Sequence, residues 1–273
     1  LSLSYDAIPQ LYTREAKSIL KFDGDTFKVA DQIQIDFEAL DDTTSLPAGD
    51  TAGTVTLVDD LLDQENRFDV GLKRQGGGVT GEWRVTDRWG LRLDAWSERR
   101  SGMKTLSSGS YIRTAVGSGA THTEDDFRVL GHELPAPVDD RTTRLSLGSG
   151  FSGKRWMVDA RFDLSRFEND LDTLTFDNPF RATDFASGTF RNRFARGRYD
   201  LAPENSARSA TVTGSVSLPA RSRLTGTVTY GIVEQDDAFA AYTLNTAISP
   251  AAGFDVTDPD NLPASDLDGE VRN

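Results

Sequence analysis

Five aspartates near the carboxyl end of the chain come closest to the spacing of a metal site. They are Asp255, Asp258, Asp260, Asp266 and Asp268. Carboxylate oxygens are the ligands that Ca²⁺ prefers, but this spacing is not that of an EF-hand loop. Blocks of carboxylates in a polar segment are usually solvated. The sequence therefore predicts a solvated acidic loop, with a calcium site as the alternative left open.

Other reactive residue types are scarce. The 273 residues contain no cysteine and only two histidines, His122 and His132. The lack of cysteine excludes disulfides, thiolate metal sites, a cysteine nucleophile and haem attachment through a CxxCH motif. Two histidines are too few for the usual His-rich metal site. We therefore predict no catalytic or cofactor-binding residue, and a protein that is not an enzyme.

The remaining polar residues of interest alternate with apolar ones, which is typical of β-strands with two different faces. The stretch SATVTGSVSLPARSRLTGTVTYGIV, residues 209–233, has one hydroxyl face and one apolar face. The predicted polar face consists of Arg92, Asp94, Asp159, Arg161, Asp163, Thr211, Thr213, Thr225 and Thr227. The predicted apolar face consists of Val158, Phe162, Val212, Val216, Leu218, Leu224, Val228 and Ile232.

Alternation predicts about seven strands in all. They cover residues 1–8, 66–85, 90–99, 141–151 and 155–166 and the two arms of the hairpin at 209–233. The apolar phase flips at Gly76–Gly78, which favours a bulge there. Short helices are expected at 11–20 and 58–65, within connections.

Short and long connections alternate along the chain. The tight turns read TDRWG, SGK and PARSR, and the long connections are predicted at 9–65, 100–140, 167–207 and 234–273. In a ladder of hairpins this places every tight turn at one end. Outer-membrane barrels have this asymmetry, with short periplasmic turns and long extracellular loops. The alternative left open is a one-sided antiparallel sheet in a secreted protein.

Composition narrows the class of protein further. A formal net charge of −13 argues against nucleic acid as a partner, because phosphate binding needs a basic surface. No apolar run approaches the roughly 20 residues of a transmembrane helix. Bacterial barrels have even strand numbers, and seven strands cannot enclose a wide lumen. Because the chain also begins within a strand, at LSLSYD, we expect an all-β arc of a larger transmembrane barrel, a cropped or processed piece forming a single β-barrel segment.

Several short motifs in a fixed order carry a resemblance. They are Ile8-Pro9, LPAPVD at 134–139, FEN at 167–169, NPF at 178–180, APEN at 202–205, Leu218-Pro219, Tyr230-Gly231 and Gln235-Asp236. Together they resemble the MtrB/PioB family of outer-membrane β-barrel proteins that accompany decahaem cytochromes. The residues matching the motifs most closely are Pro9, Pro135, Pro137, Asp139, Asn169, Asn178, Pro179, Pro203 and Asn205. Val138 departs from the family's usual Ile, and the amino-terminal CxxC of some members is absent.

The resemblance implies a barrel that houses a multihaem c-type cytochrome and so supports electron transfer across the bacterial outer membrane. The haem would be carried by that periplasmic-side partner, none by this chain, and an extracellular multihaem cytochrome is a further expected partner. The predicted polar residues would then face the lumen and the cytochrome, and the apolar ones the lipid. Trp83, Trp89 and Trp156, all near tight turns, would form an interfacial girdle. An ordinary porin or ligand-transport barrel without a cytochrome is the other alternative.

Overall fold

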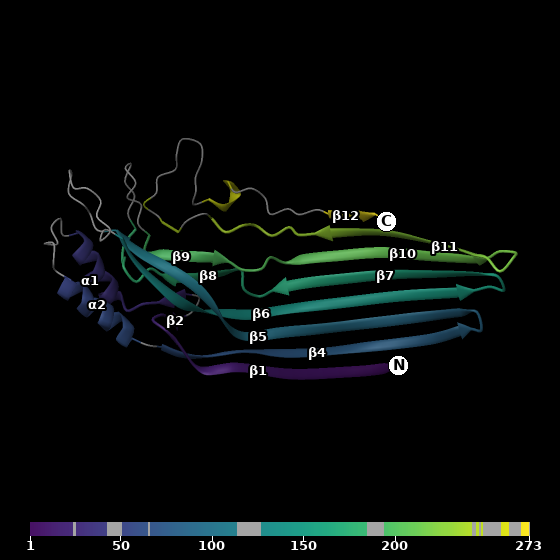
Figure 1. The fold of residues 1–273 in the computed structure, drawn as a ribbon, viewed down its shortest axis with the longest axis horizontal. Helices are drawn as coiled ribbons and strands as arrows, with labels where there is room; N and C mark the ends of the chain where they lie inside the picture. The colour runs from purple at the N-terminus through teal and green to yellow at the C-terminus, as the bar shows by residue number, and fades with distance from the viewer. Residues whose placement is uncertain are drawn as a thin grey trace.

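An antiparallel sheet of eight strands forms most of the molecule, in the computed structural model shown in Figure 1. The structure describes residues 1–23, 26–42, 51–64, 66–113, 127–184, 194–241, 244–245, 247, 258–261 and 269–272. In spatial order the strands are β1 (Ser2–Ser18), β4 (Asn66–Thr86), β5 (Trp89–Arg113), β6 (Phe127–Ser152), β7 (Trp156–Asn169), β10 (Asn205–Ser217), β11 (Arg223–Glu234) and β12 (Gly269–Arg272). β1 and β12 are the two edges, so the described part of the sheet is an open arc.

Three tight turns join β4 to β5, β6 to β7 and β10 to β11, and all lie at one end of the sheet (Figure 1). We call this the turn end and the opposite end the loop end. In the third turn Ala220 and Arg221 have φ values of 62° and 61°, and Ser222 N donates to Pro219 O at 3.4 Å. Two consecutive positive φ angles are those of a type I′ turn, whose twist matches the flanking strands. The prediction that every tight turn lies at one end of the sheet is confirmed.

The strands are longer than the alternation predicted. β1 continues to Ser18, so the helix expected at 11–20 is wrong. β5 and β6 remain paired from Arg100↔Asp140 to Arg113↔Phe127, within the span predicted as a long connection. β12 lies within the predicted final connection and is the eighth strand. Alternation missed these extensions because their side chains no longer divide into one polar and one apolar face.

The bulge predicted at Gly76–Gly78 is also wrong. β4 pairs in continuous register with both β1 and β5 through these glycines, and the irregularities lie elsewhere, as at Leu11–Ala16 of β1 and Arg84–Thr86 of β4. The apolar phase changes because the neighbour of the sheet changes. Near the turn end the apolar side chains project from one face of the sheet. Near the loop end the apolar side chains lie on the opposite face, which is covered by other residues.

A second, smaller unit covers the sheet at its loop end, and we call it the cap. It contains a four-stranded sheet in the order β2 (Lys21–Asp23), β3 (Thr26–Lys28), β8 (Thr173–Asp177) and β9 (Arg196–Asp200). Helices α1 (Asp31–Asp42) and α2 (Thr51–Asp63) pack beside it. β3 and β8 are parallel, which joins two connections far apart in the sequence. The predicted helix at 58–65 corresponds to the second half of α2.

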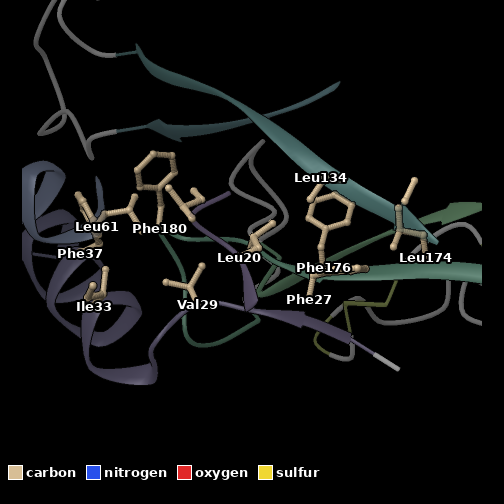
Figure 2. Close-up of a cluster of buried hydrophobic side chains, with 12 residues drawn as sticks. Leu20, Phe27, Val29, Ile33, Phe37, Leu61, Leu134, Leu174, Phe176 and Phe180 are labelled. Atoms are coloured by element: carbon tan, nitrogen blue, oxygen red, sulfur yellow. The ribbon is translucent and has the colours of Figure 1, made fainter. Parts of the chain in front are cut away.

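The main hydrophobic core of the described residues lies in the cap, not between two large sheets. Its buried side chains are Ile19, Leu20, Phe27, Val29, Ile33, Phe37, Leu61, Leu134, Ala136, Leu174, Phe176 and Phe180. Ile33 and Phe37 share one face of α1 because they are four residues apart. The ring of Phe37 meets that of Phe180 edge-on at 5.1 Å. Figure 2 shows Leu134 near Phe176 in this cluster, at a distance from Phe37 and Phe180.

The cap is fixed to one face of the large sheet. Leu134 and Ala136 of β6 and Leu106 of β5 contact the cap core, and Leu106 is directly opposite Leu134. Ser18 Oγ, at the end of β1, donates to Glu133 O at 2.8 Å. Among the described helices none is long and apolar enough to cross a membrane. The cap therefore covers the loop end of a single face, which is the face described next.

Candidate functional site

The structure places all nine predicted polar residues on one face of the large sheet. Residues directly opposite each other in neighbouring strands share a face. Arg92, Gly148, Arg161 and Thr211 form one such row across β5, β6, β7 and β10. Asp94, Asp159, Asp163, Thr213, Thr225 and Thr227 lie in rows of the same face. We call this the polar face, and it is the face that the cap covers at the loop end.

An ion pair crosses the polar face from β5 to β7. The guanidinium of Arg92 donates to Asp159, passing over β6. Two glycines of β6 make this possible, since a Cβ at Gly148 would lie 3.0 Å from Arg92 Nε and one at Gly150 would lie 3.1 Å from Asp159 Oδ2. The strand between the partners thus contributes no side chain at the crossing. The sequence predicted that these residues share a face, but not that they form a pair.

On the same face, Arg161 binds one residue of its own strand and one residue of β6. Its Nε donates to Asp163 Oδ1 at 2.7 Å and to Ser146 Oγ at 3.0 Å. Asp94, by contrast, is exposed and makes no hydrogen bond or ion pair within the described part of the chain. These side chains border an open hollow of about 610 Å³, which is lined among others by Ser2, Thr80, Glu82, Arg92, Asp94, Ser146 and Arg161. Both arginines that line the hollow are thus neutralised by carboxylates of the same sheet.

Hydroxyl groups replace charges toward β11. Thr211 Oγ1 and Thr229 Oγ1 are 3.1 Å apart, and so are Thr213 Oγ1 and Thr227 Oγ1. Ser215 continues the row and accepts from Arg223 Nη2 at 2.7 Å. Cross-strand hydroxyl pairs stabilise a sheet without adding net charge. This part of the polar face is a neutral, hydrogen-bonding surface.

Toward the cap, the polar face carries ion pairs that the sequence analysis missed. Arg74 donates to both carboxylate oxygens of Glu98 at 2.9 and 3.0 Å. Arg100 binds Asp140 through two bonds of 2.7 and 2.8 Å. Two-bonded arginine–carboxylate pairs fix geometry as well as charge. The signal was present, because the alternation of Arg92 and Asp94 continues to Glu98 and Arg100, but the predicted strand stopped at Arg99.

A tryptophan lies on the polar face between these two zones. Trp96 is directly opposite Gly78, and its ring lies so close that a Cβ at Gly78 would be 3.1 Å from Trp96 Cδ1. The guanidinium carbon of Arg144 lies 5.9 Å from the ring centroid, within cation–π range. The glycine run thus provides the space for an aromatic ring. The glycine run therefore makes room for Trp96 and does not bend the strand.

The opposite face of the sheet is apolar toward the turn end. It carries all the predicted apolar residues that lie in strands, and Leu218 follows β10 directly in the turn. Several are strongly exposed, with Val228 at 68% and Leu224 at 62%. Trp83, Trp89 and Trp156 lie on this face near the turns, each over a third exposed, and the Trp156 ring stacks on Phe151 at 5.2 Å. A continuous exposed apolar face of this size indicates an apolar neighbour.

A family model described as "Putative outer membrane beta-barrel porin, MtrB/PioB" matches residues 1–273. The chain belongs to the MtrB/PioB family. Outer membrane protein MtrB of Shewanella baltica (strain OS185) is similar to it, with 23% identity over 188 residues. That match covers 69% of this chain and 24% of the relative, so the chain spans about a quarter of the curated protein.

Membership of the MtrB/PioB family confirms the predicted class and location. The sheet is an arc of an outer-membrane β-barrel porin, and the protein is located in the outer membrane. The turn end is therefore the periplasmic end, and the loop end with its cap is extracellular.

Most of the residues that match MtrB/PioB motifs lie in the cap or near the ends of strands that adjoin it. Pro135 and Pro137 lie in β6 before its pairing with β7 begins at Asp140, where a missing N–H breaks no bond to β7. Asn178 Nδ2 donates to Phe194 O at 2.9 Å, and Pro179 beside it is fully buried. Asn169 Nδ2 donates to Ala202 O at 2.9 Å. The others are Pro9 in the edge strand β1, Asp139 in β6, Pro203 before β10 and Asn205 at its start.

The acidic segment gives no support for calcium among its described residues. Asp258 Oδ1 accepts from Asp260 N at 3.0 Å, so Asp258 closes a short turn of the chain. Within the described ranges no three acidic, His or Cys residues lie close enough to hold a metal. Asp255, Asp266 and Asp268 lie outside the described residues. The calcium site therefore stays the open alternative to the predicted solvated loop.

Asp177 is the buried carboxyl group of the cap. Burial raises its pKa, although Arg196 Nε at 3.1 Å and Val29 N at 3.3 Å both donate to it. The folded cap thus holds this proton more tightly than the unfolded chain does. Below the ordinary carboxyl pKa the group costs no stability, and the cap loses stability as the pH rises through the raised pKa.

We expect Asp177→Asn to remove this loss, so that cap stability changes less between pH 4 and pH 7 than in the wild type. Hydrogen exchange of cap amides over this range measures the slope. Asp23→Asn is the control that should leave the slope between pH 4 and pH 7 unchanged. Its carboxylate accepts from Lys28, which lowers the pKa of Asp23, so its contribution is lost only as the pH falls below this range. An unchanged slope in Asp177→Asn would contradict the assignment.

Proposed function

We propose that the chain forms part of the wall of an outer-membrane barrel that houses a multihaem c-type cytochrome, and so supports electron transfer across the membrane. In this role the protein is a sheath and not an enzyme. The apolar face meets lipid and the polar face lines the lumen. The observation that carries the proposal is the separation of a polar from an apolar face toward the turn end of the large sheet, because only a polar lumen accepts Arg92, Asp159 and Arg161 at membrane depth.

The polar face suits a protein guest more than a stream of ions. Two of its arginines near mid-height are bound to carboxylates of the same wall, in the pairs Arg92–Asp159 and Arg161–Asp163. A cytochrome in the lumen therefore need not supply a counter-charge for each of them. The threonine ladder adds donors and acceptors that can adapt to main-chain or propionate groups. Asp94 remains available to a basic group of the guest.

The haem would belong entirely to the partner. The chain has no cysteine and two histidines, so it offers neither thioether attachment nor a series of axial ligands. The proposed division of work is that the cytochrome carries electrons while the wall excludes lipid and holds the cytochrome in place. The relative named Outer membrane protein MtrB supports the location of this role. An extracellular multihaem cytochrome would meet the assembly at the cap.

A pair of matched double variants in the full-length protein tests the proposal. Thr213 and Thr227 are opposite each other on the polar face, and Val212 and Val228 are opposite each other on the apolar face. Thr213→Trp with Thr227→Trp adds bulk inside the lumen, and overpacking of about 1–3 kcal/mol weakens retention of a guest roughly 5- to 150-fold. Val212→Trp with Val228→Trp adds similar bulk toward lipid. The readout is haem absorbance per barrel after affinity purification from cells that also express the cytochrome.

We expect the threonine double variant to lose most of its haem and the valine double variant to keep it. Both must first show normal heat-modifiable migration on a gel, which reports an assembled barrel. Equal haem content in the threonine variant and the wild type would contradict a guest at this part of the wall. A colourless wild-type preparation would reject the cytochrome altogether and leave an ordinary porin.

A further inference from the structure

A line of basic residues borders the apolar face on its extracellular side. Five neighbouring strands each contribute one: Lys73 of β4, Arg99 of β5, Arg141 of β6, Arg166 of β7 and Arg208 of β10. The register puts them all on the apolar side of the sheet, because Arg99 is opposite Arg141 and Arg166 is opposite Thr143, in rows that alternate with those of the polar face. We call this the basic line.

The basic line keeps a constant distance from the periplasmic border of the apolar face. In each of the five strands the basic residue is ten residues from a large apolar side chain at the turn end. The pairs are Lys73 with Trp83, Arg99 with Trp89, Arg141 with Phe151, Arg166 with Trp156 and Arg208 with Leu218. One cation at the edge of a strand would be unremarkable. The same interval in five adjacent strands defines two parallel borders.

These borders fit the geometry of a membrane. From Lys73 to Arg208 the line shifts six residues toward the turn end over four strand steps, since Lys73 is opposite Ser101 and Arg166 is opposite Ser206. That is about 20 Å along the strands for about 19 Å across them, or a tilt of about 45°. Ten residues then span about 24 Å of membrane thickness, close to the roughly 25 Å apolar band of outer-membrane barrels. The basic line is thus level with the outer lipid headgroups.

The charges of the basic line are only partly neutralised. Arg99 binds Asp139 through bonds of 2.7 and 2.6 Å, Arg166 lies 3.1 Å from Glu168, and Arg208 lies 2.6 Å from Glu234. Lys73 and Arg141 are exposed and form no ion pair with another described residue. At the same height on the polar face, Arg74 and Arg100 are both held by carboxylates. Free positive charge therefore occurs on the side that faces lipid, in a chain of net charge −13.

We infer that the basic line binds the phosphate groups of lipid headgroups in the outer leaflet, with Lys73 and Arg141 as the principal contacts. Arginine and lysine are the side chains that recognise phosphate, and each basic residue at a charged membrane surface contributes roughly fivefold in affinity. The paired arginines retain free N–H groups that can add to a phosphate already bound. The inference rests on the outward orientation proposed above, and it is independent of the cytochrome.

The test uses the full-length protein in phosphatidylcholine nanodiscs with a small fraction of lipid A, either bisphosphorylated or dephosphorylated. Native mass spectrometry counts the lipid A retained. We expect the wild type to retain the bisphosphorylated form preferentially, and Lys73→Gln with Arg141→Gln to weaken retention by about thirtyfold. Lys73→Arg with Arg141→Lys keeps the charge and should keep the lipid. Arg144→Gln removes an arginine from the other face of β6 and should have no effect.

Three outcomes would overturn the inference. They are equal retention of both lipid A forms, unchanged retention in the glutamine double variant, and displacement of lipid A by inorganic phosphate at the same phosphate concentration. The last would assign the line to free anions. Haem content measured on the same samples separates the proposals, because lipid A binding with no haem would reject only the cytochrome.

Discussion

Val228→Arg is expected to destabilise the assembled barrel by about 2–4 kcal/mol, the cost of a basic side chain at the bilayer midplane. Val228 is central in the apolar face, opposite Val212 and 68% exposed. Because the stability of a whole domain is typically about 5–15 kcal/mol, the variant should lose a large fraction of its stability and unfold at a clearly lower urea concentration than the wild type. The measurements are the fraction with heat-modifiable gel migration and a urea titration of that fraction.

Thr227→Arg is the matched control for this change. Thr227 is the neighbouring residue, but its side chain lies on the polar face beside Thr213. We expect it to assemble nearly as well as the wild type, since an arginine in a lumen remains solvated or finds a carboxylate. The reverse result, with Thr227→Arg unassembled and Val228→Arg normal, would show that the two faces have been assigned the wrong way round.

Leu134→Ala is expected to weaken the attachment of the cap by about 2–5 kcal/mol. Leu134 is fully buried and is the side chain through which β6 enters the cap core (Figure 2). The truncation leaves a cavity where β6 meets the buried side chains of the cap. Limited proteolysis of intact cells should then cut the cap faster, while the barrel still migrates as an assembled species.

Leu147→Ala, in the same strand, separates cap loss from general damage. Leu147 lies on the apolar face and is 46% exposed, so its truncation removes lipid contact without creating an enclosed cavity. We expect its cap to resist protease as the wild type does. If Leu134→Ala and Leu147→Ala were cut at the same rate, the cap would not depend on its contact with β6.

The two faces of the sheet could be predicted from sequence because alternation is a local property. A period of two and one tight turn were enough to place four threonines on the same face, namely Thr211, Thr213, Thr225 and Thr227. The MtrB/PioB motifs were equally local, and the family match confirmed the family that they indicated. The same logic failed at 11–20, where a strand with both faces exposed has no period to detect.

The cap and the ion pairs of the wall depend on distant contacts, so no local pattern contains them. β2, β3, β8 and β9 have three to five residues each, too few to show a period. Arg92 finds Asp159 only because Gly148 lies between them in a third strand. At Gly76–Gly78 the phase change was real, but its cause was the cap covering the opposite face. Which surface becomes covered is decided by tertiary structure.

The cap is built from two segments that are distant in the sequence, so its parts must assemble in a fixed order. Phe27 of β3 pairs with Phe176 of β8, and the strands β4 to β7 of the wall lie between them in the chain. Neither half can bury its phenylalanines alone, and contacts so remote in sequence form slowly. The apolar side chains of the first half therefore stay uncovered until the four wall strands β4 to β7 have been added to the chain and β8 follows. Chaperones that hold unfolded barrel proteins would be needed longest for residues 19–63, and the cap could close once β8 is available, before β10 to β12 complete the arc.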